Sequence, residues 1–560
     1  PQEHASMSDR RDATAGGPGN AAGMPAGSSR LDRRLGVTDA TVIGLGAMIG
    51  AAHNGRVCAC YPAHAGFDVL VREQADEAGG GSRTVETVPG YRFDTHSVAH
   101  NIINMTDIPA ELDLAGAGLV YRQMDPFAVS VRGDGRIVRF HRDVDATVAS
   151  LAETAPHDAF AYAGFMERAL PVIDAVMLGI DAGAGPRRAL SQLPSRARGA
   201  LLALTRNGGP TGLARLLVAP YARLLAEHLH SDVARAPVAA FAAHSSASPA
   251  QTGSSMYSLW QAAYHRFGQW HAVGGAQGLV DALVTRLESY GGRVRTSANV
   301  QRIVREAGRV RGVSLDSGEQ LGAPVVVSAI DPRSALLELL DPPLVGAVAD
   351  ELRATHRGNA VQMLVHVATT ALPAYPSGRP GDWNGLQSHV NGLDDLVAGF
   401  AAAEARRLPP DPVPTYAFTT SALDDTLAPA GHHTVYLACP SAPFDLEGGW
   451  STQADGFAER MLDVVEARAP GFRDTIVGTS VRTPEQMAAE LRWPGAHPMV
   501  LDITIDQLAW LRPTQSLSRY HTPVRGLFLS GAGTAPTGGF AGSPGRGAAK
   551  AVLRRHGTPP

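Results

Sequence analysis

The chain of 560 residues is poor in cysteine and has no long apolar run, and each absence excludes a class of protein. Its three cysteines, Cys58, Cys60 and Cys439, are too few for a disulfide scaffold, and none forms the CxxC pair of a disulfide reductase. No uncharged apolar run of about 18 residues occurs, so we expect no membrane-spanning helix. A net charge of −4 without a basic stripe argues against nucleic-acid binding. We therefore expect a cytosolic protein.

The sequence also lacks the local patterns of several other enzyme classes. It contains no Walker loop, no nucleophile elbow and no paired-cysteine zinc pattern. His96 and His100 lie four residues apart, but no further ligand has the spacing that a metal site needs. These absences direct attention to cofactor chemistry.

The stretch from Ala40 to Glu73 has the pattern of a nucleotide-binding unit. A short apolar run is followed by a glycine-studded turn, and a helical stretch then ends at Gly66. A second apolar run, Phe67–Val71, leads to Glu73. In such a β-turn-α-β unit the helix N-terminus faces a pyrophosphate, and the acidic residue accepts hydrogen bonds from ribose hydroxyls. The sequence thus predicts a dinucleotide site with Glu73 at the ribose.

The glycine spacing in this turn is irregular. Gly44 and Gly46 follow the strand, but Ile49 occupies the position of a third glycine. In a second register, Gly50 to Gly55, the middle position is an alanine. Glu73 lies 23 positions after Gly50 (73 − 50), close to the roughly 20 expected for the ribose carboxylate. We interpret the turn as lengthened between residues 47 and 52, with the helix proper starting at Gly55, and leave open which glycines contact the pyrophosphate.

Two further glycine-rich segments support a long cofactor. One follows Glu73 directly and contains Gly80, Gly81 and Arg83. The other lies near the C-terminal end of the sequence, where an apolar run from residue 526 leads through a glycine loop to a helix beginning near Gly542. Backbone amides and a helix dipole can meet an electron-rich group there. The loop residues predicted to contact the cofactor are Gly531, Gly538 and Gly539.

On these residues the chain resembles the flavin-dependent phytoene desaturase family, within the amine-oxidase and glutathione-reductase-like flavoproteins. The matching segments include HNG at 53–55, VLVRE with GGGSRT at 69–84, YRFDT at 91–95, GGAQGLVDAL at 274–283 and GLFLSGAGTAPTGGFAGSPGRGAAKAVL at 526–553. The resemblance implies bound FAD, with Val300 packed over adenine and the segment around His96 near the flavin ring. Three departures are the lengthened first turn, His96 where glycine is usual, and Ala535 where histidine is common.

The resemblance and the pattern together imply an α/β fold: a discontinuous Rossmann-type FAD-binding domain with an inserted α+β substrate domain. We expect an N-terminal disordered arm at 1–36 and an FAD-binding domain at 37–110, 271–332 and 500–560. The substrate domain is expected at 111–270 and 333–499. The periodicity of 110–270 is mostly helical, with helices over 144–153, 160–180 and 213–229, the last interrupted at Pro220.

The candidate catalytic residues are His96, His100 and Arg512. The histidines are candidates for acid–base chemistry or for substrate orientation, with polar lining of a cleft as the alternative. Arg512 is a candidate anchor for a carboxylate or the flavin, with a structural ion pair as the alternative. An aromatic-rich patch predicts either core packing or the wall of an apolar pocket. It comprises Tyr257, Trp260, Tyr264, His265 and Trp270.

The expected activity is dehydrogenation of a carbon–carbon bond in an apolar substrate, with hydride transfer to FAD. Oxygen or a quinone would then reoxidise the flavin. The alternatives are an amine or alcohol oxidase, a non-catalytic flavoprotein partner, and an isomerase that keeps its flavin reduced. Peripheral membrane contact and a homo-oligomer stay open.

Overall fold

The computed structural model describes residues 40–43, 51–181 and 193–557. The expected N-terminal arm and the glycines Gly44, Gly46 and Gly50 therefore lie outside the described residues. The remaining candidate residues can all be placed. The described residues all belong to one compact unit.

A five-stranded parallel sheet holds the nucleotide-binding pattern. Its strands come from three distant parts of the chain, and β13 and β20 are buried throughout, as expected for a parallel sheet covered on both faces. The order is β20 (Leu527–Leu529), β13 (Val325–Ser328), β1 (Ala40–Ile43), β2 (Asp68–Arg72) and β9 (Arg293–Arg295).

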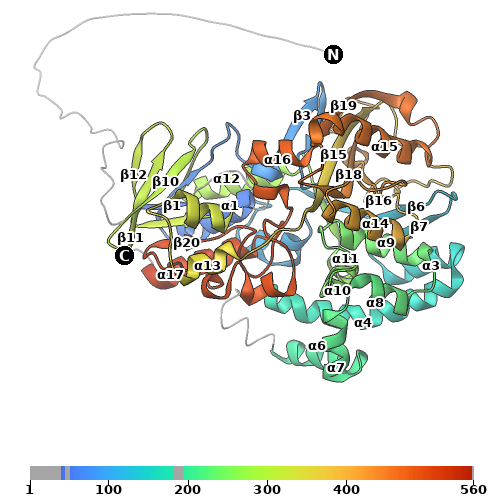
Figure 1. Cartoon of the computed structure of the whole chain (residues 1–560), viewed down its shortest axis with the longest axis horizontal. Helices are drawn as coiled ribbons and strands as arrows, with labels where there is room; N and C mark the ends of the chain where they lie inside the picture. The colour runs from blue at the N-terminus through green and yellow to red at the C-terminus, as the bar shows by residue number, and fades with distance from the viewer. Residues whose placement is uncertain (1–39, 44–50, 182–192, 558–560) are drawn as a thin grey trace, which may run out of the picture. The chain divides into compact units, whose positions relative to one another are not determined.

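Three helices pack together against this sheet. Helix α1 (Ala51–His64) contacts both α12 (Gln277–Ser289) and α17 (Ser543–His556), and their buried faces share one apolar cluster with Val69 and Val327. Gly545 permits the close approach of α17, because a Cβ there would collide with the Asn54 carbonyl of α1. Figure 1 shows β1, α1, α12, α17 and β20 gathered in one part of the molecule.

A second sheet contacts the parallel sheet through β11 and β13, and two strand pairs form separate ribbons. The hairpin between β10 and β11 turns at Ala307 and Gly308, whose φ angles of 47° and 72° are those of a two-residue turn with positive φ at both positions. The sheet has the order β12 (Gln320–Gly322), β11 (Arg309–Leu315), β10 (Val300–Glu306), β14 (Leu340–Asp341). The ribbons pair β3 (Thr84–Val88) with β4 (Tyr91–Asp94), and β5 (Tyr121–Met124) with β8 (Gln269–Ala272).

A seven-stranded sheet forms the second large layer. All its neighbours are antiparallel except β16 and β6, which are parallel. Helices α14 (Leu393–Glu404), α15 (Ala454–Glu466) and α16 (Pro484–Leu491) contact its strands. The order is β19 (Ile476–Arg482), β15 (Ala360–Thr369), β18 (His433–Pro443), β17 (Tyr416–Phe418), β16 (Leu386–Ser388), β6 (Ala128–Val131) and β7 (Ile137–Phe140).

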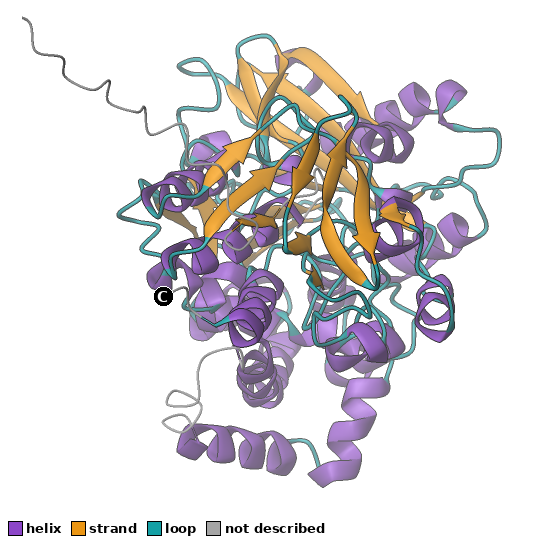
Figure 2. Cartoon of the chain, turned by 90° about the vertical axis from the view of Figure 1, so that its left-hand side faces the viewer, coloured by secondary structure: helices purple, strands orange, loops and turns teal. Residues whose placement is uncertain are grey.

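The longest helical segment, between β7 and β8, packs against this second sheet. Phe127 of the sheet layer stacks on Tyr264 of α11, so helices and sheet share one core. Figure 2 shows the helices in purple beside the orange strands. The helices are α3 (Val144–Thr154), α4 (Pro156–Asp181), α6 (Leu193–Arg206), α7 (Gly209–Val218), α8 (Tyr221–His228), α9 (Asp232–Ala243), α10 (Ser255–Leu259) and α11 (Gln261–Phe267). Short helices α2 (Ile108–Glu111) and α13 (Ala347–Arg353) lie elsewhere in the chain.

The α/β fold class is confirmed, and two local predictions need correction. Helix α1 already includes Ala51, so Gly55 lies inside the helix rather than at its start. Glycine is placed there because an added Cβ would lie 3.1 Å from the Cβ of Ala329. Strands β5, β6 and β7 interrupt the segment predicted to be mostly helical. The sequence did not indicate them, because short strands produce little periodicity of their own. The predicted interruption at Pro220 is confirmed, since α7 ends at Val218 and α8 begins at Tyr221.

Candidate functional site

The carboxyl ends of β13 and β20 lie side by side, and they bring two glycine segments together. Gly531, just after β20, has a φ of +88°, and a Cβ there would lie 2.9 Å from the carbonyl carbon of Ala329. Gly55 of α1 approaches the same alanine. Ser328 ends β13 and Ser530 directly follows β20, and each hydroxyl is buried without a hydrogen-bond partner among the described residues. This edge of a parallel sheet is where an α/β fold binds its ligand.

Glu73 follows β2 at the same edge, as the sequence predicts. Its side chain is buried, and its carboxylate lies 3.6 Å from Nη2 of Arg56 on α1. Burial lowers the pKa of Arg56, and the neighbouring Glu73 acts in the opposite direction. The pair places a hydrogen-bond acceptor and a cation inside the protein next to the first helix.

The segment after Glu73 forms a buried turn. Gly80 and Gly81 belong to a single 3₁₀ turn, Gly80–Ser82, and are both buried. The Arg83 Nη2 atom donates 2.7 Å to Glu490 of α16. The hydroxyl of Ser82 is buried and has no partner within the described chain. The turn therefore connects the nucleotide unit to α16 of the second layer.

Asp94 fastens this segment to the GGAQG loop that precedes α12. Its carboxylate accepts a 2.6 Å hydrogen bond from the Thr84 hydroxyl and one of 2.7 Å from the Ala276 amide. Burial raises its pKa, while the two hydrogen bonds act against the increase. Gly275, with φ +82°, leaves the room that Asp94 and Thr84 occupy.

The loop before α17 lies over the first helix. Gly539 has a φ of +73°, and a Cβ on Gly538 would lie 2.9 Å from the Met499 carbonyl oxygen. The next residue, Phe540, is stacked between two imidazoles. Its ring centre lies 3.8 Å from that of His53 and 4.4 Å from that of His100.

A cavity of about 770 Å³ opens beside this loop. Its volume lies within the range of small-molecule sites, and most of its walls are aliphatic or aromatic. Tyr257, Trp260 and Tyr264 of the predicted aromatic patch line it, whereas His265 and Trp270 are not among its lining residues. Further walls come from Val98, Ile102, Phe241, Leu508 and Phe540.

The two candidate histidines have different surroundings. His96 lines the cavity, and His100 does not. Burial lowers the pKa of His96 well below its ordinary value, and Arg482, His366 and Arg83 lower it further. For His100, burial followed by the influence of His271 lowers the pKa to about 3, and Nδ1 lies 2.9 Å from the Tyr121 hydroxyl. Both rings are therefore neutral at physiological pH.

Arg512 is fully buried behind the cavity wall. Its guanidinium donates to the main-chain carbonyls of Met499, Leu501, Asp502, Gln507 and Ala532. Burial lowers its pKa to about 10. Because every one of these acceptors is a carbonyl of the chain itself, the geometry favours a positioning role over contact with substrate.

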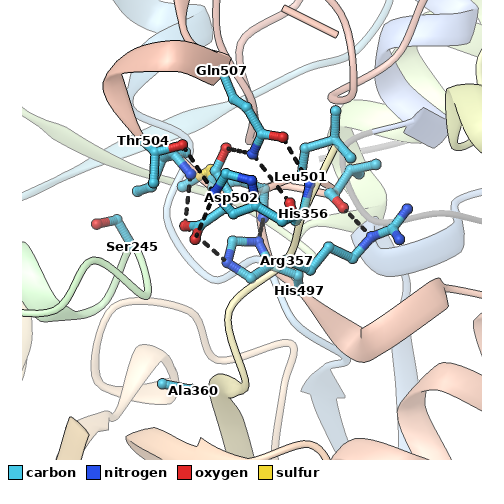
Figure 3. Close-up of polar contacts among 12 residues, drawn as sticks. Ser245, His356, Arg357, Ala360, His497, Leu501, Asp502, Thr504 and Gln507 are labelled. Carbon is cyan, nitrogen blue, oxygen red and sulfur yellow. Dashed lines mark hydrogen bonds and ion pairs between the residues drawn. The ribbon is translucent and has the colours of Figure 1, made fainter. Parts of the chain in front are cut away.

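The side chains of Gln507 and Arg357 also hold the segment that Arg512 contacts (Figure 3). Gln507 donates to the carbonyls of His356 and Asp502, and its side-chain oxygen accepts from the His356 amide at 2.8 Å. Arg357 donates 2.7 Å to the Val500 carbonyl. This network fixes residues 497–507, which supply Pro498, Met499 and Ile503 to the cavity wall.

Comparison with known proteins identifies the family. The model for flavin-containing amine oxidoreductases matches residues 57–553. The chain belongs to this family. A mouse protein called pyridine nucleotide-disulfide oxidoreductase domain-containing protein 2 is 30% identical over 90% of this chain and 93% of its own length. The neurosporene-forming phytoene desaturase of Rhodobacter capsulatus is 29% identical, but over 51% of this chain and 53% of its own length.

A solved structure agrees with the fold. Cyclohexylamine oxidase from Brevibacterium oxydans superimposes with a TM-score of 0.55 at 15% identity, covering 93% of this chain and 98% of that one. At this identity the similarity shows the fold alone. The family model assigns the chain as an FAD-dependent oxidoreductase.

The described residues fit an FAD molecule along the edge of the parallel sheet. Buried polar atoms without partners in the described chain accompany the three glycine segments, as expected where a polar ligand supplies the missing hydrogen bonds. They include both ring nitrogens of His53 and the hydroxyls of Ser82, Thr95, Ser328 and Ser530. Val300 is buried in the apolar cluster of the flanking sheet, and its predicted contact with adenine stays a prediction.

Several residues of this site were missed by the sequence reasoning. They are His53, Arg56, Ser328, Ser530 and Phe540, of which His53, Ser530 and Phe540 lie inside segments that carry the resemblance. The HNG segment could have indicated His53. The two serines could have been found as polar residues at the end of an apolar strand. Arg56 had no signal, because only the fold brings it to Glu73.

Three further features of the described residues concern metal binding, membrane spanning and thiol chemistry. No group of three or more His, Cys, Asp or Glu side chains there could hold a metal ion. None of the described helices combines the length and apolarity needed to cross a bilayer. The three cysteines are buried and free, and burial raises the pKa of each thiol, to about 12 for Cys60 and to about 11 for Cys439. Such thiols are poor redox groups.

Proposed function

We propose that this flavoprotein dehydrogenates a carbon–carbon bond of a largely apolar substrate. The supporting observation is the cavity of about 770 Å³, which is walled by aliphatic and aromatic side chains and bordered by the glycine loop at 535–540. Such a cavity binds an apolar body and keeps water away from it. The phytoene desaturase relative is consistent with this proposal.

The chain's own residues would orient the substrate and handle the proton. When bound, FAD supplies the hydride acceptor. His96 lines the cavity as a neutral imidazole, so in this proposal it would orient the substrate or take up the proton that leaves the neighbouring carbon. His100 would fix the Phe540 wall by stacking. Arg512 would position the 499–512 segment.

The glycines keep the roles that the sequence predicts as part of this proposal. Gly55, Gly80, Gly81, Gly531, Gly538 and Gly539 would let the backbone approach the cofactor, and which glycines contact the pyrophosphate is left open. Glu73 would bind the ribose. Arg83, whose guanidinium also donates a hydrogen bond to Glu490 of α16, would contact the cofactor. The carboxylate of Glu73 is buried at the sheet edge, as this role requires.

A direct test uses the purified protein under anaerobic conditions. Bound FAD would be identified by its release and mass. The protein would then be mixed with chain-length-matched ketones, acids, alcohols and primary amines, while the oxidised flavin absorbance is followed. The proposal predicts bleaching with a product that has lost two hydrogens and gained a C=C bond.

The same experiment separates the alternatives. A product with C=N or C=O at a former amine or alcohol carbon would establish an oxidase instead. FAD that no compound bleaches would favour a non-catalytic partner, and turnover only after chemical reduction would favour an isomerase. Reoxidation of the bleached protein by oxygen or by a soluble quinone would identify the electron acceptor.

Peripheral membrane contact is a further part of the proposal. Leu201 and Leu202 of α6 and Val218 at the end of α7 are exposed large apolar side chains. Such residues beside arginines suit an interfacial helix. Flotation with anionic lipid vesicles tests this contact: the native chain should float, and Leu201→Glu should stay at the bottom of the gradient.

A further inference from the structure

Two nitrogen-bearing rings, those of His96 and Trp493, lie next to each other in the cavity wall, and we call this part the His96–Trp493 end. His96 and Trp493 both line the cavity, and their rings meet edge to face with centres 5.5 Å apart. The Trp493 indole is 2% exposed, and its Nε1 has no hydrogen-bond partner among the described residues. Nε2 of His96 also lacks one. A buried N–H left without an acceptor is destabilising, so an acceptor is expected at this point.

The chain holds Trp493 firmly in this position. It follows the end of α16, where Arg492 has a φ of 46° and turns the backbone. The Trp493 amide donates a hydrogen bond of 2.8 Å to the Ala488 carbonyl. Nη1 of Arg492 donates one of 2.7 Å to the Asn299 side chain. The indole is therefore pre-positioned at the cavity wall.

The charge behind this wall is positive. Arg83 and Arg482 both contact the carboxylate of Glu490, so two cations share one anion. After burial, these two arginines and His366 are the influences that lower the pKa of His96. Burial also holds His366 neutral, with its pKa lowered to about 3. An electron-rich group is favoured at this end of the cavity, and an ammonium group is disfavoured.

We infer that the His96–Trp493 end of the cavity binds an electron-rich oxygen of the substrate, a carbonyl or carboxylate, while the remaining walls hold its apolar body. The indole N–H donates and cannot accept, so its partner must be an acceptor. This inference rests on the proposed function. The expected substrate is then an apolar molecule that bears an oxygen atom, and not a pure hydrocarbon or an amine.

Matched ligands test this inference without requiring turnover. Calorimetric titration of the FAD-containing protein would compare 2-tridecanone, dodecanoate, dodecylamine and dodecane. We expect the ketone and the carboxylate to bind at least about tenfold more tightly than the amine and the alkane, since one added hydrogen bond is worth about that factor. Equal binding of all four, or preference for the amine, would overturn the inference.

Two variants locate the effect. Trp493→Phe keeps an aromatic ring and removes the N–H. It should therefore weaken binding of the ketone about tenfold and leave the affinity for dodecane unchanged. Trp260→Phe is the matched control, because Trp260 lines the same cavity. It should change all four ligands by similar factors. Arg482→Gln should weaken the binding of dodecanoate and strengthen the binding of dodecylamine. If Trp493→Phe leaves the ratio of ketone to alkane affinity unchanged, the inference fails.

A carbonyl of the bound flavin could be the acceptor instead, and the same variants decide this. In that case Trp493→Phe would shift the flavin absorption spectrum or speed FAD release, while ligand affinities stay constant. That result overturns the substrate assignment. Because these ligands are tested by binding, failure of the inference is distinct from failure of the proposed dehydrogenation, which is judged by flavin bleaching.

Discussion

The Glu73 carboxylate lies 3.6 Å from the Arg56 guanidinium, and both side chains are buried at the edge of the parallel sheet. The acidic residue that we propose at the ribose is thus paired with a cation from the first helix. Its removal should affect cofactor binding and stability together, because a buried charge loses a partner.

Glu73→Gln should weaken FAD binding by roughly 10- to 100-fold, since a charged hydrogen-bond acceptor is replaced by a neutral one. The apo-protein should also lose stability, by up to about 3–5 kcal/mol. Equilibrium dialysis of FAD and denaturant unfolding measure the two effects. Glu77→Gln, which changes an exposed acid nearby, is the control. FAD affinity equal to that of the native chain would rule out the ribose role.

Gly275→Ala should destabilise the fold through a collision. The added Cβ would meet Thr84 and would lie 2.6 Å from Oδ1 of Asp94, at a φ of +82°. Gly291 has the same φ and open space around its Cβ position, so Gly291→Ala measures the backbone cost alone. We expect Gly275→Ala to cost about 1–3 kcal/mol more than Gly291→Ala. Equal melting temperatures for the two variants would show that the loop adjusts freely.

Arg512→Lys should lower the free energy of unfolding by at least about 3 kcal/mol. The guanidinium donates hydrogen bonds to five main-chain carbonyls, and a lysine ammonium cannot donate to all of them. Arg525→Lys, at an exposed position, is the control. Thermal unfolding provides the measurement. A variant with native stability that no longer reduces its flavin would contradict the positioning role and restore Arg512 as a catalytic candidate.

The neutral buried histidines predict loss of stability in acid. The pKa of His100 is about 3 in the folded chain and about 6.5 when unfolded, so below pH 6.5 the unfolded state binds more protons. Stability should therefore fall as the pH falls from about 6.5 towards 3.

His100→Gln tests this contribution by denaturant unfolding at pH 7 and pH 5. The variant should lose about 2 kcal/mol less than the native chain between the two pH values. His157→Gln, at an exposed histidine, should lose as much as the native chain. An identical loss in His100→Gln and the native chain would mean that His100 is protonated in the folded state.

Much of the nucleotide unit could be predicted from local sequence. The apolar runs of β2, β13 and β20, the position of Glu73 and the helix after Gly542 follow from short-range patterns that the fold preserves. The interruption at Pro220 is equally local, because proline lacks the amide that a helix interior needs. The turn with Gly44, Gly46 and Gly50 lies outside the described residues, so its pyrophosphate contacts stay a prediction.

What the sequence alone determined is the fold class and the FAD cofactor, because glycine, turn and strand signals act within a few residues. The tertiary structure decided which distant side chains meet. Arg56 meets Glu73, Trp493 meets His96, and Phe540 lies between His53 and His100. It also assigned Tyr257, Trp260 and Tyr264 to the cavity and gave Arg512 its carbonyl partners. These contacts depend on packing between segments hundreds of residues apart, and no local pattern encodes such packing.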